Sequence, residues 1–290
     1  MAPRPKIRCR QIAESDLDSV IDLLVRGFPR RDRAYWQRGL GRQAVRPVPE
    51  GVPRFGYMLD CDGRAVGVLL VLGDAAHVDG RLEARCNLSS WYVDPEYRSY
   101  APLLVAIPLK LKDVTFVNVS PAPHTWPIVE AQGFSPICQG QFTAFPFLAK
   151  PVRGVRVRAV TAEDVASSFP SVPDFDLLRT HADYGCVSLV CSTPDGDYPF
   201  VFRPFRRWRD RLPCMRLIYC REAGDFVRFA GPLGRHLLRG GSPWVILDSD
   251  GPVEGLVGFY QARSGRKYFK GPHKPRLGDL AYTEFALFGP

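Results

Sequence analysis

Polar and apolar residues alternate at the start of the chain, and the pattern then changes to a helical period. Residues 6–12 alternate as a strand with one buried face requires. Directly afterwards Leu17, Val20, Ile21 and Leu24 recur at helical spacing, with acidic residues in the first turns, where the helix dipole favours them. The pattern therefore predicts a strand followed by a helix.

The rest of the first half continues this alternation of strands and helices. Apolar runs at 55–59 and 65–72 flank a turn that contains Asp62-Gly63, which is a strong hairpin signal. A short basic and aromatic helix is expected before the hairpin, over 31–39. After the hairpin we expect a strand over 83–93, a helix over 101–112, a strand over 114–119, a helix over 123–132 and a strand pair within 134–148.

The second half repeats this order more loosely. Residues 155–165 match the opening strand and helix start at 7–16, and a hairpin is expected at 186–202 around Asp195-Gly196. Strands are expected near 214–220, 244–247, 256–261 and 280–288, and a helix near 225–239. The stretch 150–154 is the natural junction, so we predict two domains, 1–149 and 150–290.

Composition narrows the class of protein. The 290 residues are 46% hydrophobic and 12% aromatic, which indicates a globular chain, and no apolar run approaches the ~20 residues that span a bilayer. The eight cysteines form no Cys-x-x-Cys pair and the N-terminus has no secretory pattern, so we expect reduced thiols in a cytoplasmic protein without a metal site. The net charge of +9 is spread over both halves and favours anionic ligands.

Three segments carry a resemblance to a known family. They are the strand and helix at 7–24, the sequence Trp-Tyr-Val-Asp-Pro-Glu-Tyr-Arg-Ser-Tyr-Ala at 91–101, and Val-Glu-Ala-Gln-Gly-Phe at 129–134. Together with the order of elements, they resemble the GNAT acyltransferase superfamily over about 6–148 and, more faintly, over 153–290. The resemblance implies an α+β fold with two GNAT-like domains, each a mixed, mostly antiparallel twisted sheet flanked by helices.

The resemblance implies that an acyl-CoA pyrophosphate binds after the strand 83–93. The first N–H groups of the helix that follows lack intrahelical partners and attract a phosphate. The family pattern carries over to Arg98, Ser99, Tyr100 and Ala101 as cofactor-binding residues. However, Ala101 and Leu103 replace the family's two glycines, and the proline between them has no N–H to donate. A plain strand-to-helix connection without a ligand is therefore the alternative.

The end of the same strand is the second contact with the acyl donor that the resemblance implies. In the family, this strand end hydrogen-bonds the pantetheine arm, much as an extended peptide adds to a sheet edge. Trp91 and Val93 correspond to these cofactor-binding positions. The alternative is that Trp91 and Tyr92 are ordinary core and surface aromatics.

The resemblance leaves the catalytic residues open. The tyrosine that often donates a proton in the family corresponds to Val129, so Tyr92 and Tyr100 are the candidate substitutes. Glu83, early in the strand, and His124, after the next strand, are the candidate bases because amine acylation needs a proton acceptor. A solvated surface carboxylate and a structural histidine are the competing interpretations of these two residues.

The sequence therefore predicts an N-acyltransferase that moves an acyl group, most simply acetyl from acetyl-CoA, to a small-molecule or peptide amine. A catalytically inert GNAT-like binding protein is one alternative, because the glycines are lost. An aminoacyl-tRNA-dependent transferase is another, because arginines and aromatics cluster at 26–38 and 203–211 and could pair with phosphates and stack on bases. We expect no metal and no membrane partner, and the oligomeric state stays open.

Overall fold

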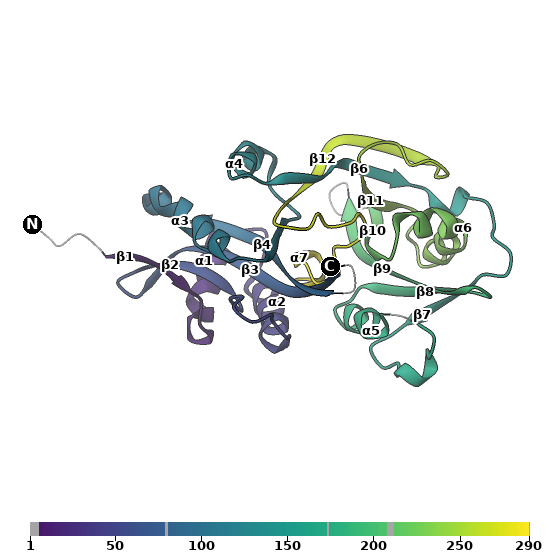
Figure 1. Cartoon of the computed structure of the whole chain (residues 1–290), viewed down its shortest axis with the longest axis horizontal. Coiled ribbons are helices and arrows are strands. Elements are labelled where there is room, and N and C mark those ends of the chain that lie inside the picture. The colour runs from purple at the N-terminus through teal and green to yellow at the C-terminus, as the bar shows by residue number, and fades with distance from the viewer. Residues whose placement is uncertain (1–5, 79–80, 173, 208–211, 290) are drawn as a thin grey trace, which may run out of the picture. The chain divides into compact units, whose positions relative to one another are not determined.

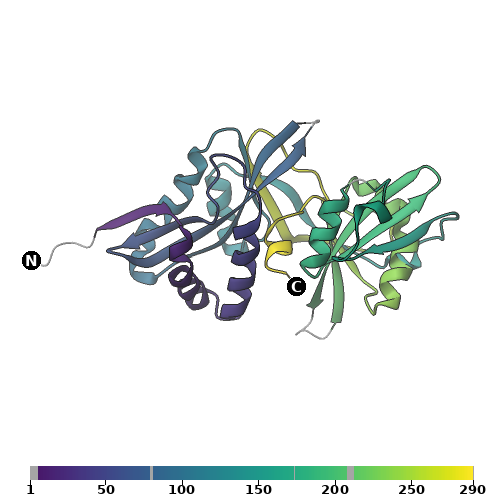
Figure 2. The same ribbon diagram turned by 90° about the horizontal axis from the view of Figure 1, so that it is seen from below.

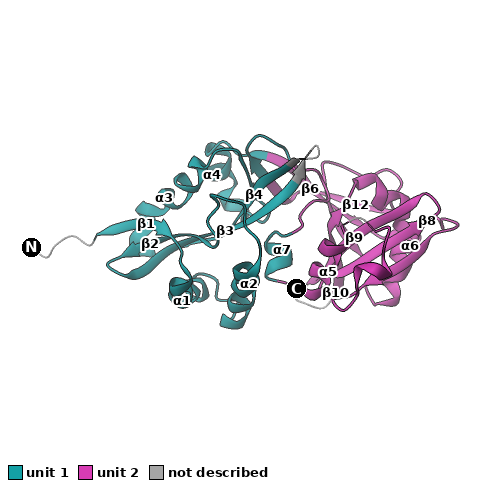
Figure 3. Ribbon diagram, turned by 60° about the horizontal axis from the view of Figure 1, so that its bottom comes forward, with its two compact units in different colours: residues 1–135, 268–274, 282–288 teal, residues 136–267, 275–281, 289–290 magenta. Residues whose placement is uncertain are grey.

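A computed structural model describes residues 6–78, 81–172, 174–207 and 212–289 (Figure 1). These residues form two compact units, which are described separately (Figure 3). Unit 1 contains the residues up to Ser135 together with Tyr268–Lys274 and Tyr282–Phe288. Unit 2 contains Pro136–Lys267 and Pro275–Ala281. The chain thus returns to unit 1 near its C-terminus.

Unit 1 is built on five strands in the order β1-β2-β3-β4-β5. Neighbouring strands are antiparallel except for β4 and β5, which are parallel. The strands are β1 (Ile7–Gln11), β2 (Gly56–Cys61), β3 (Arg64–Val78), β4 (Arg81–Val93) and β5 (Val114–Asn118). The end of a further strand, β12 (Gly258–Lys270), pairs with β5 through residues 268–270.

Helices cover both faces of the unit 1 strands. Figures 2 and 3 show α1 and α2 on one side and α3 and α4 on the other. The α-helices are α1 (Leu17–Gly27), α2 (Arg33–Val45), α3 (Ala101–Ala106), α4 (Trp126–Ala131) and α7 (Glu284–Leu287). Short 3₁₀ helices are η1 (Glu14–Asp16), η2 (Pro95–Tyr100), η3 (Pro108–Lys110) and η4 (Pro123–Thr125).

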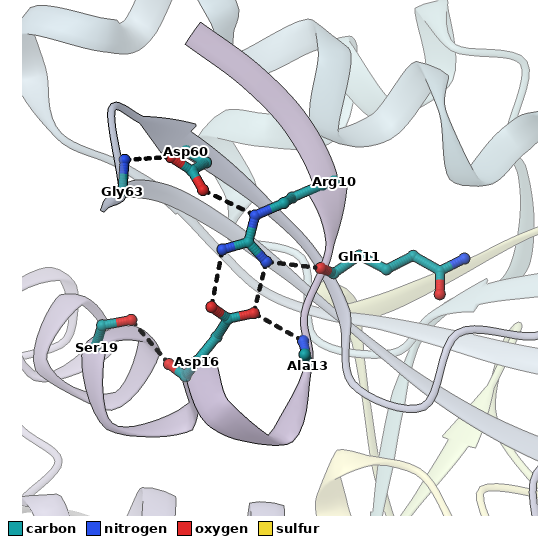
Figure 4. A network of polar contacts seen from close by, with 7 residues as sticks. All are labelled: Arg10, Gln11, Ala13, Asp16, Ser19, Asp60 and Gly63. Carbon is teal, nitrogen blue, oxygen red and sulfur yellow. Dashed lines mark hydrogen bonds and ion pairs between the residues drawn. The ribbon is translucent and has the colours of Figure 1, made fainter.

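A polar network fixes the connection from β1 to α1 (Figure 4). The guanidinium of Arg10 donates to both oxygens of Asp16, at 2.6 and 2.8 Å, and to Asp60 at 2.8 Å. The same carboxylates accept the backbone N–H groups of Ala13 and Gly63. Hydrogen bonding to the guanidinium lowers the pKa of both aspartates, so they stay ionised and hold the strand, the helix start and the hairpin turn together.

Unit 2 repeats the arrangement of four antiparallel strands followed by a parallel one. Its order is β7-β8-β9-β10-β11-β6-β12, in which β10 and β11 are parallel and β6 and β11 are antiparallel. The strands are β7 (Arg156–Val160), β8 (Val187–Thr193), β9 (Gly196–Arg207), β10 (Leu212–Cys220), β11 (Val245–Ser249) and β6 (Ser135–Ala144). The remaining helices are α5 (Phe175–Asp183), α6 (Ala223–Arg239), η5 (Pro146–Leu148) and η6 (Ala166–Ser168). The predicted α+β class, with mixed, mostly antiparallel sheets flanked by helices, is confirmed.

Three predicted elements differ from the observed ones. The helix expected over 101–112 ends at Ala106 and is followed by the 3₁₀ helix Pro108–Lys110, because Pro108 has no N–H with which to continue the α-helical hydrogen bonds. The strand pair expected within 134–148 is the single strand β6, followed by a 3₁₀ helix that starts at Pro146. The strand expected over 280–288 is wrong, since Glu284–Leu287 form the short helix α7.

The observed division of the chain also differs from the predicted junction at 149/150. Residues 136–149 are expected in the first domain, whereas the structure packs them in unit 2. Backbone pairing of β6 with β11 is the reason, because strand partners outweigh proximity in the chain. Within the described ranges, no helix is long and apolar enough to cross a membrane.

Candidate functional site

The parallel strands β4 and β5 separate part of the way along β4. Residues 84–87 of β4 pair with 114–117 of β5, and the ladder between them ends there. β4 continues to Val93, whereas β5 ends at Asn118 and the chain turns toward η4. The two strand ends therefore diverge and leave the edge of β4 after residue 87 without a β5 partner.

A β-bulge marks the same stretch of β4. Opposite it on β3, Val68 faces Tyr92 and Leu70 faces Ser89, so three positions of β3 face four of β4. Ser90 has φ = 52°, in the left-handed region that residues other than glycine rarely adopt. Bulges bend a strand and re-aim its side chains, and they are frequent beside active sites.

A cavity of about 440 Å³ opens between the diverging strands. Its walls come from β4, from the segment between β5 and α4, from the region where α1 leads into α2, and from α7. All of these elements belong to unit 1. The volume lies within the roughly 300–1,000 Å³ typical of small-molecule sites.

A carboxylate joins the two diverging strands at this cavity. Glu284 accepts a short hydrogen bond from Ser89 Oγ on β4 and a 2.7 Å hydrogen bond from Ser120 Oγ, just after β5. Its backbone N–H donates to Asn87 Oδ1 at 2.8 Å. Asn87 is itself 2% exposed and donates to Leu88 O. Three polar contacts thus fix the start of α7 against β4 and the end of β5.

Aromatic rings form the opposite wall. Phe28 lies 5.5 Å from Trp36 and 6.3 Å from Tyr92 between ring centroids, and Tyr35 lies 5.0 Å from Trp36. Trp36 is 2% exposed and Tyr92 is half-buried. Partial burial, followed by the nearby charge of Asp94, raises the pKa of the Tyr92 phenol. Tyr92 therefore stays protonated at neutral pH and can donate a proton.

The structure brings three of the predicted site residues together at this cavity. Trp91 and Tyr92 line it from β4, and His124 lines it from η4, where its ring is exposed. Val93 follows them on β4 but is buried in the core of unit 1, at 7% exposure. Glu83 lies off the cavity and contacts His273, Oε1 to Nε2, at 2.9 Å.

The predicted pyrophosphate residues lie outside this cavity. Arg98, Ser99 and Tyr100 are exposed on η2, and Ala101 begins α3. The Ala101 N–H donates to Arg98 O, and the Tyr97 N–H donates to Asp94 O at 2.9 Å. These amides are therefore engaged within the 3₁₀ turns. The charge of Arg98 and the hydroxyls of Ser99 and Tyr100 remain exposed for a ligand, and their role stays a prediction.

Three residues at the cavity were not predicted from the sequence: Glu284, Ser89 and Ser120. Glu284 lies in a segment for which the pattern predicted a strand, and 195 positions of the chain separate it from Ser89. The serines carry no motif of their own. Only the pairing of strands places these residues at one cavity. Among the described residues, His, Cys, Asp and Glu form no group that could hold a metal ion.

No protein-family model matches the chain, and no curated protein matches its sequence. Solved structures do match it. One is a GCN5-related N-acetyltransferase from Anabaena variabilis, with 14% identity, a TM-score of 0.57, and 91% of this chain and 72% of that chain covered. Another is a GCN5-related N-acetyltransferase from Kribbella flavida, with 17% identity and a TM-score of 0.58; the match covers 91% of this chain and 71% of that chain. The chain therefore has the GNAT superfamily fold.

Proposed function

We propose that the protein is an N-acyltransferase that moves an acyl group from a CoA thioester to an amine, with its active site in unit 1. The observation that carries this proposal is the separation of β4 from β5 at a bulge beside the cavity. The pantetheine arm of CoA is an extended chain with amide groups, which suits an unpaired strand edge. The GNAT fold supports the same assignment.

The reaction needs a proton acceptor for the ammonium and a proton donor for the thiolate. The ammonium loses a proton, its nitrogen bonds to the thioester carbonyl carbon, and the C–S bond breaks. One ammonium and one acyl-CoA thus give one amide, one CoA thiol and one proton. Tyr92 can supply the donor and His124 can accept the first proton, because both line the cavity. Glu83 is occupied by His273 and is the weaker candidate base.

The direct test combines calorimetry with a thiol-release assay. We expect acetyl-CoA and longer acyl-CoAs to bind, and thiol release to depend on an added primary amine. Tyr92→Phe should lower kcat about 100-fold if the phenol is the proton donor. Tyr97→Phe is the matched control, since its hydroxyl contacts Arg64 Nη2 at 3.1 Å and lies off the cavity. Failure of every thioester to bind would refute the proposal.

Arg98 is proposed to hold the CoA pyrophosphate. We expect Arg98→Ala to weaken acetyl-CoA binding by about 1–2 kcal/mol, the usual loss for one charge-assisted contact. Arg153→Ala, which removes an exposed arginine of unit 2, should leave the dissociation constant unchanged. Equal affinity of the Arg98→Ala variant and the wild type would remove Arg98 from the site.

The two alternative functions give different results in the same assays. Tight binding of acyl-CoA without turnover of any amine would indicate an inert binding protein. Binding of tRNA with a steep salt dependence, and none of acyl-CoA, would indicate an aminoacyl-tRNA-dependent transferase. The structure gives the basic clusters other partners: Arg26 pairs with Asp94 at 3.0 Å, and Arg33 pairs with Asp18 at 2.6 Å. Residues 208–211 of the second cluster lie outside the described residues.

A further inference from the structure

Unit 2 has a surface groove of about 260 Å³, lined by α6 and by the segment that leads into β7. One side of the groove is a single face of α6, because residues three or four positions apart lie next to each other on a helix: Pro232, Arg235, His236 and Arg239. The other side consists of three valines: Val152, Val155 and Val157. This groove, called the basic groove below, thus joins a basic helix face to an apolar segment.

The charge of the basic groove has one sign. Among the described residues that line it, three side chains are basic and none is a carboxylate. Arg235 is half-buried and donates to the carbonyl of Ala149 at 3.4 Å, and Arg239 is exposed at the end of the helix. Within the described part of the chain, neither guanidinium is ion-paired with a carboxylate. The C-terminus of a helix carries about half a negative charge, which two guanidinium groups outweigh, so the groove attracts an anion.

His236 lies in the same positive surroundings. Its ring is half-buried, and burial, followed by the charge of Arg239, lowers its pKa. The ring is therefore mostly neutral at neutral pH and adds a hydrogen-bonding nitrogen rather than a full charge. Two guanidinium charges beside the negative end of a helix favour a singly charged carboxylate over a doubly charged phosphate.

The valines give the basic groove an apolar floor, which a plain basic surface lacks. Val155 and Val157 are half-buried and pack against the hydrophobic core of unit 2, and Val152 is 36% exposed. The arginine stems add methylene groups to this surface while their guanidinium ends stay polar. The groove therefore suits a ligand with a negative charge at one end and an apolar chain at the other.

We infer that the basic groove is a further ligand site, which binds a short-chain carboxylate with its charged group on Arg235 and Arg239 and its chain along the valines. The planar fork of a guanidinium matches a carboxylate through two parallel, charge-assisted hydrogen bonds. The inference does not depend on the proposed function, because the residues of the groove belong to unit 2 and none of them lines the cavity of unit 1.

Binding of four small probes, measured by calorimetry, tests the class of ligand. The probes are hexanoate, the neutral hexan-1-ol, acetate, which lacks the chain, and hexyl phosphate. We expect hexanoate to bind about tenfold more tightly than hexan-1-ol or acetate, since roughly two buried methylene groups suffice for a tenfold gain. Equal affinity for hexanoate and hexan-1-ol would overturn the role of the arginines, and equal affinity for hexanoate and acetate would overturn that of the valines. Tighter binding of hexyl phosphate would overturn the choice of a carboxylate.

The imidazole NMR resonances of His236 locate the bound hexanoate. The chain has five histidines, and the variant His236→Gln assigns the resonances of this one. We expect hexanoate to shift the His236 resonances and to leave those of His124, which lines the cavity of unit 1, unchanged. A shift of His124 without a shift of His236 would place hexanoate in the cavity of unit 1 and overturn the inference.

Arg239→Gln tests the positive charge itself. Because Arg239 is exposed, its loss should weaken hexanoate binding about fivefold and leave the affinity for hexan-1-ol unchanged. The matched control is Arg179→Gln on α5, an exposed arginine of unit 2 that lies off the groove and pairs with Asp176 at 3.8 Å; it should bind hexanoate like the wild type. The same hexanoate affinity in both variants would overturn the inference. Circular dichroism establishes that each variant folds, and if Arg239→Gln does not fold, the His236 shift in the wild type decides.

Discussion

Replacing Gly39 with alanine tests how the C-terminal segment that carries Glu284 is held in unit 1. Gly39 lies on α2 where the helix meets Phe288. A Cβ at residue 39 would lie 2.8 Å from Phe288 Cγ and closer still to two other ring carbons, whereas carbon atoms in contact lie about 3.5–4.0 Å apart. Because the nearest ring carbon lies much closer than this contact distance, the ring would have to move by about 2 Å.

The Phe288 ring has little room for such a movement. It is 1% exposed and packs on Tyr35 and Trp36, each at 5.4 Å between centroids. Overpacking of this kind costs about 1–3 kcal/mol. Gly→Ala in a helix interior also gives about 1 kcal/mol of helix stabilisation, which would partly mask the cost.

Gly41→Ala supplies the control for this helix effect. Gly41 lies on the same helix, is exposed, and has no atom within 4 Å of an added Cβ. The stability difference between the two variants therefore isolates the packing cost, which we expect to be about 1–3 kcal/mol in urea unfolding. Amide exchange at Leu287 and Phe288 should be faster in Gly39→Ala, because their N–H groups bond within α7. Equal stability and equal exchange in the two variants would refute the close approach.

Two further predictions concern buried and partly buried charges. Lys267→Met should destabilise the protein by about 3–5 kcal/mol in urea unfolding, because it leaves the buried Asp248 without the ammonium that lies 2.6 Å away. Adding Asp248→Leu should restore most of the lost stability. A double variant as unstable as Lys267→Met would contradict this explanation. Arg10→Ala should cost about 1 kcal/mol at pH 7, since the Arg10 side chain is 38% exposed and water screens its pairs. Arg10 lowers the pKa of Asp16 and Asp60 in the folded state, so its contribution is present above about pH 4 and is lost as the pH falls through their folded values. The stability difference between wild type and Arg10→Ala should thus shrink in acid, and a constant difference from pH 7 to pH 2 would exclude this linkage.

The hydrophobic pattern predicted the elements of unit 1 well wherever local signals decide structure. The strand expected over 114–119 is observed at Val114–Asn118, and the hairpin expected around Asp62-Gly63 joins β2 to β3. A short period of apolar residues and a turn dipeptide depend on a few neighbouring residues only. The strand predicted over 280–288 is wrong because the conformation of this segment depends on the packing of Phe288 against Trp36 of α2.

The candidate site was predictable in part. Trp91 and Tyr92 were identified through a motif at the end of β4, and His124 through its place after β5. These residues could be placed because the order of strands and helices along the chain resembles that of the GNAT superfamily. The bulge at Ser90 had no sequence signal, since serine is not a residue that demands a positive φ.

The sequence by itself determined the α+β class, the repeated order of strands and helices, and the GNAT resemblance, because each depends on local periodicity and on contiguous motifs. Only the tertiary structure decided where the chain divides, how β4 separates from β5, and which carboxylate faces the cavity. Glu284 is hydrogen-bonded to Ser89 and Ser120, from which it is separated by 195 and 164 positions of the sequence. Such contacts arise from strand pairing and side-chain packing between distant segments, and no local pattern of residues encodes them.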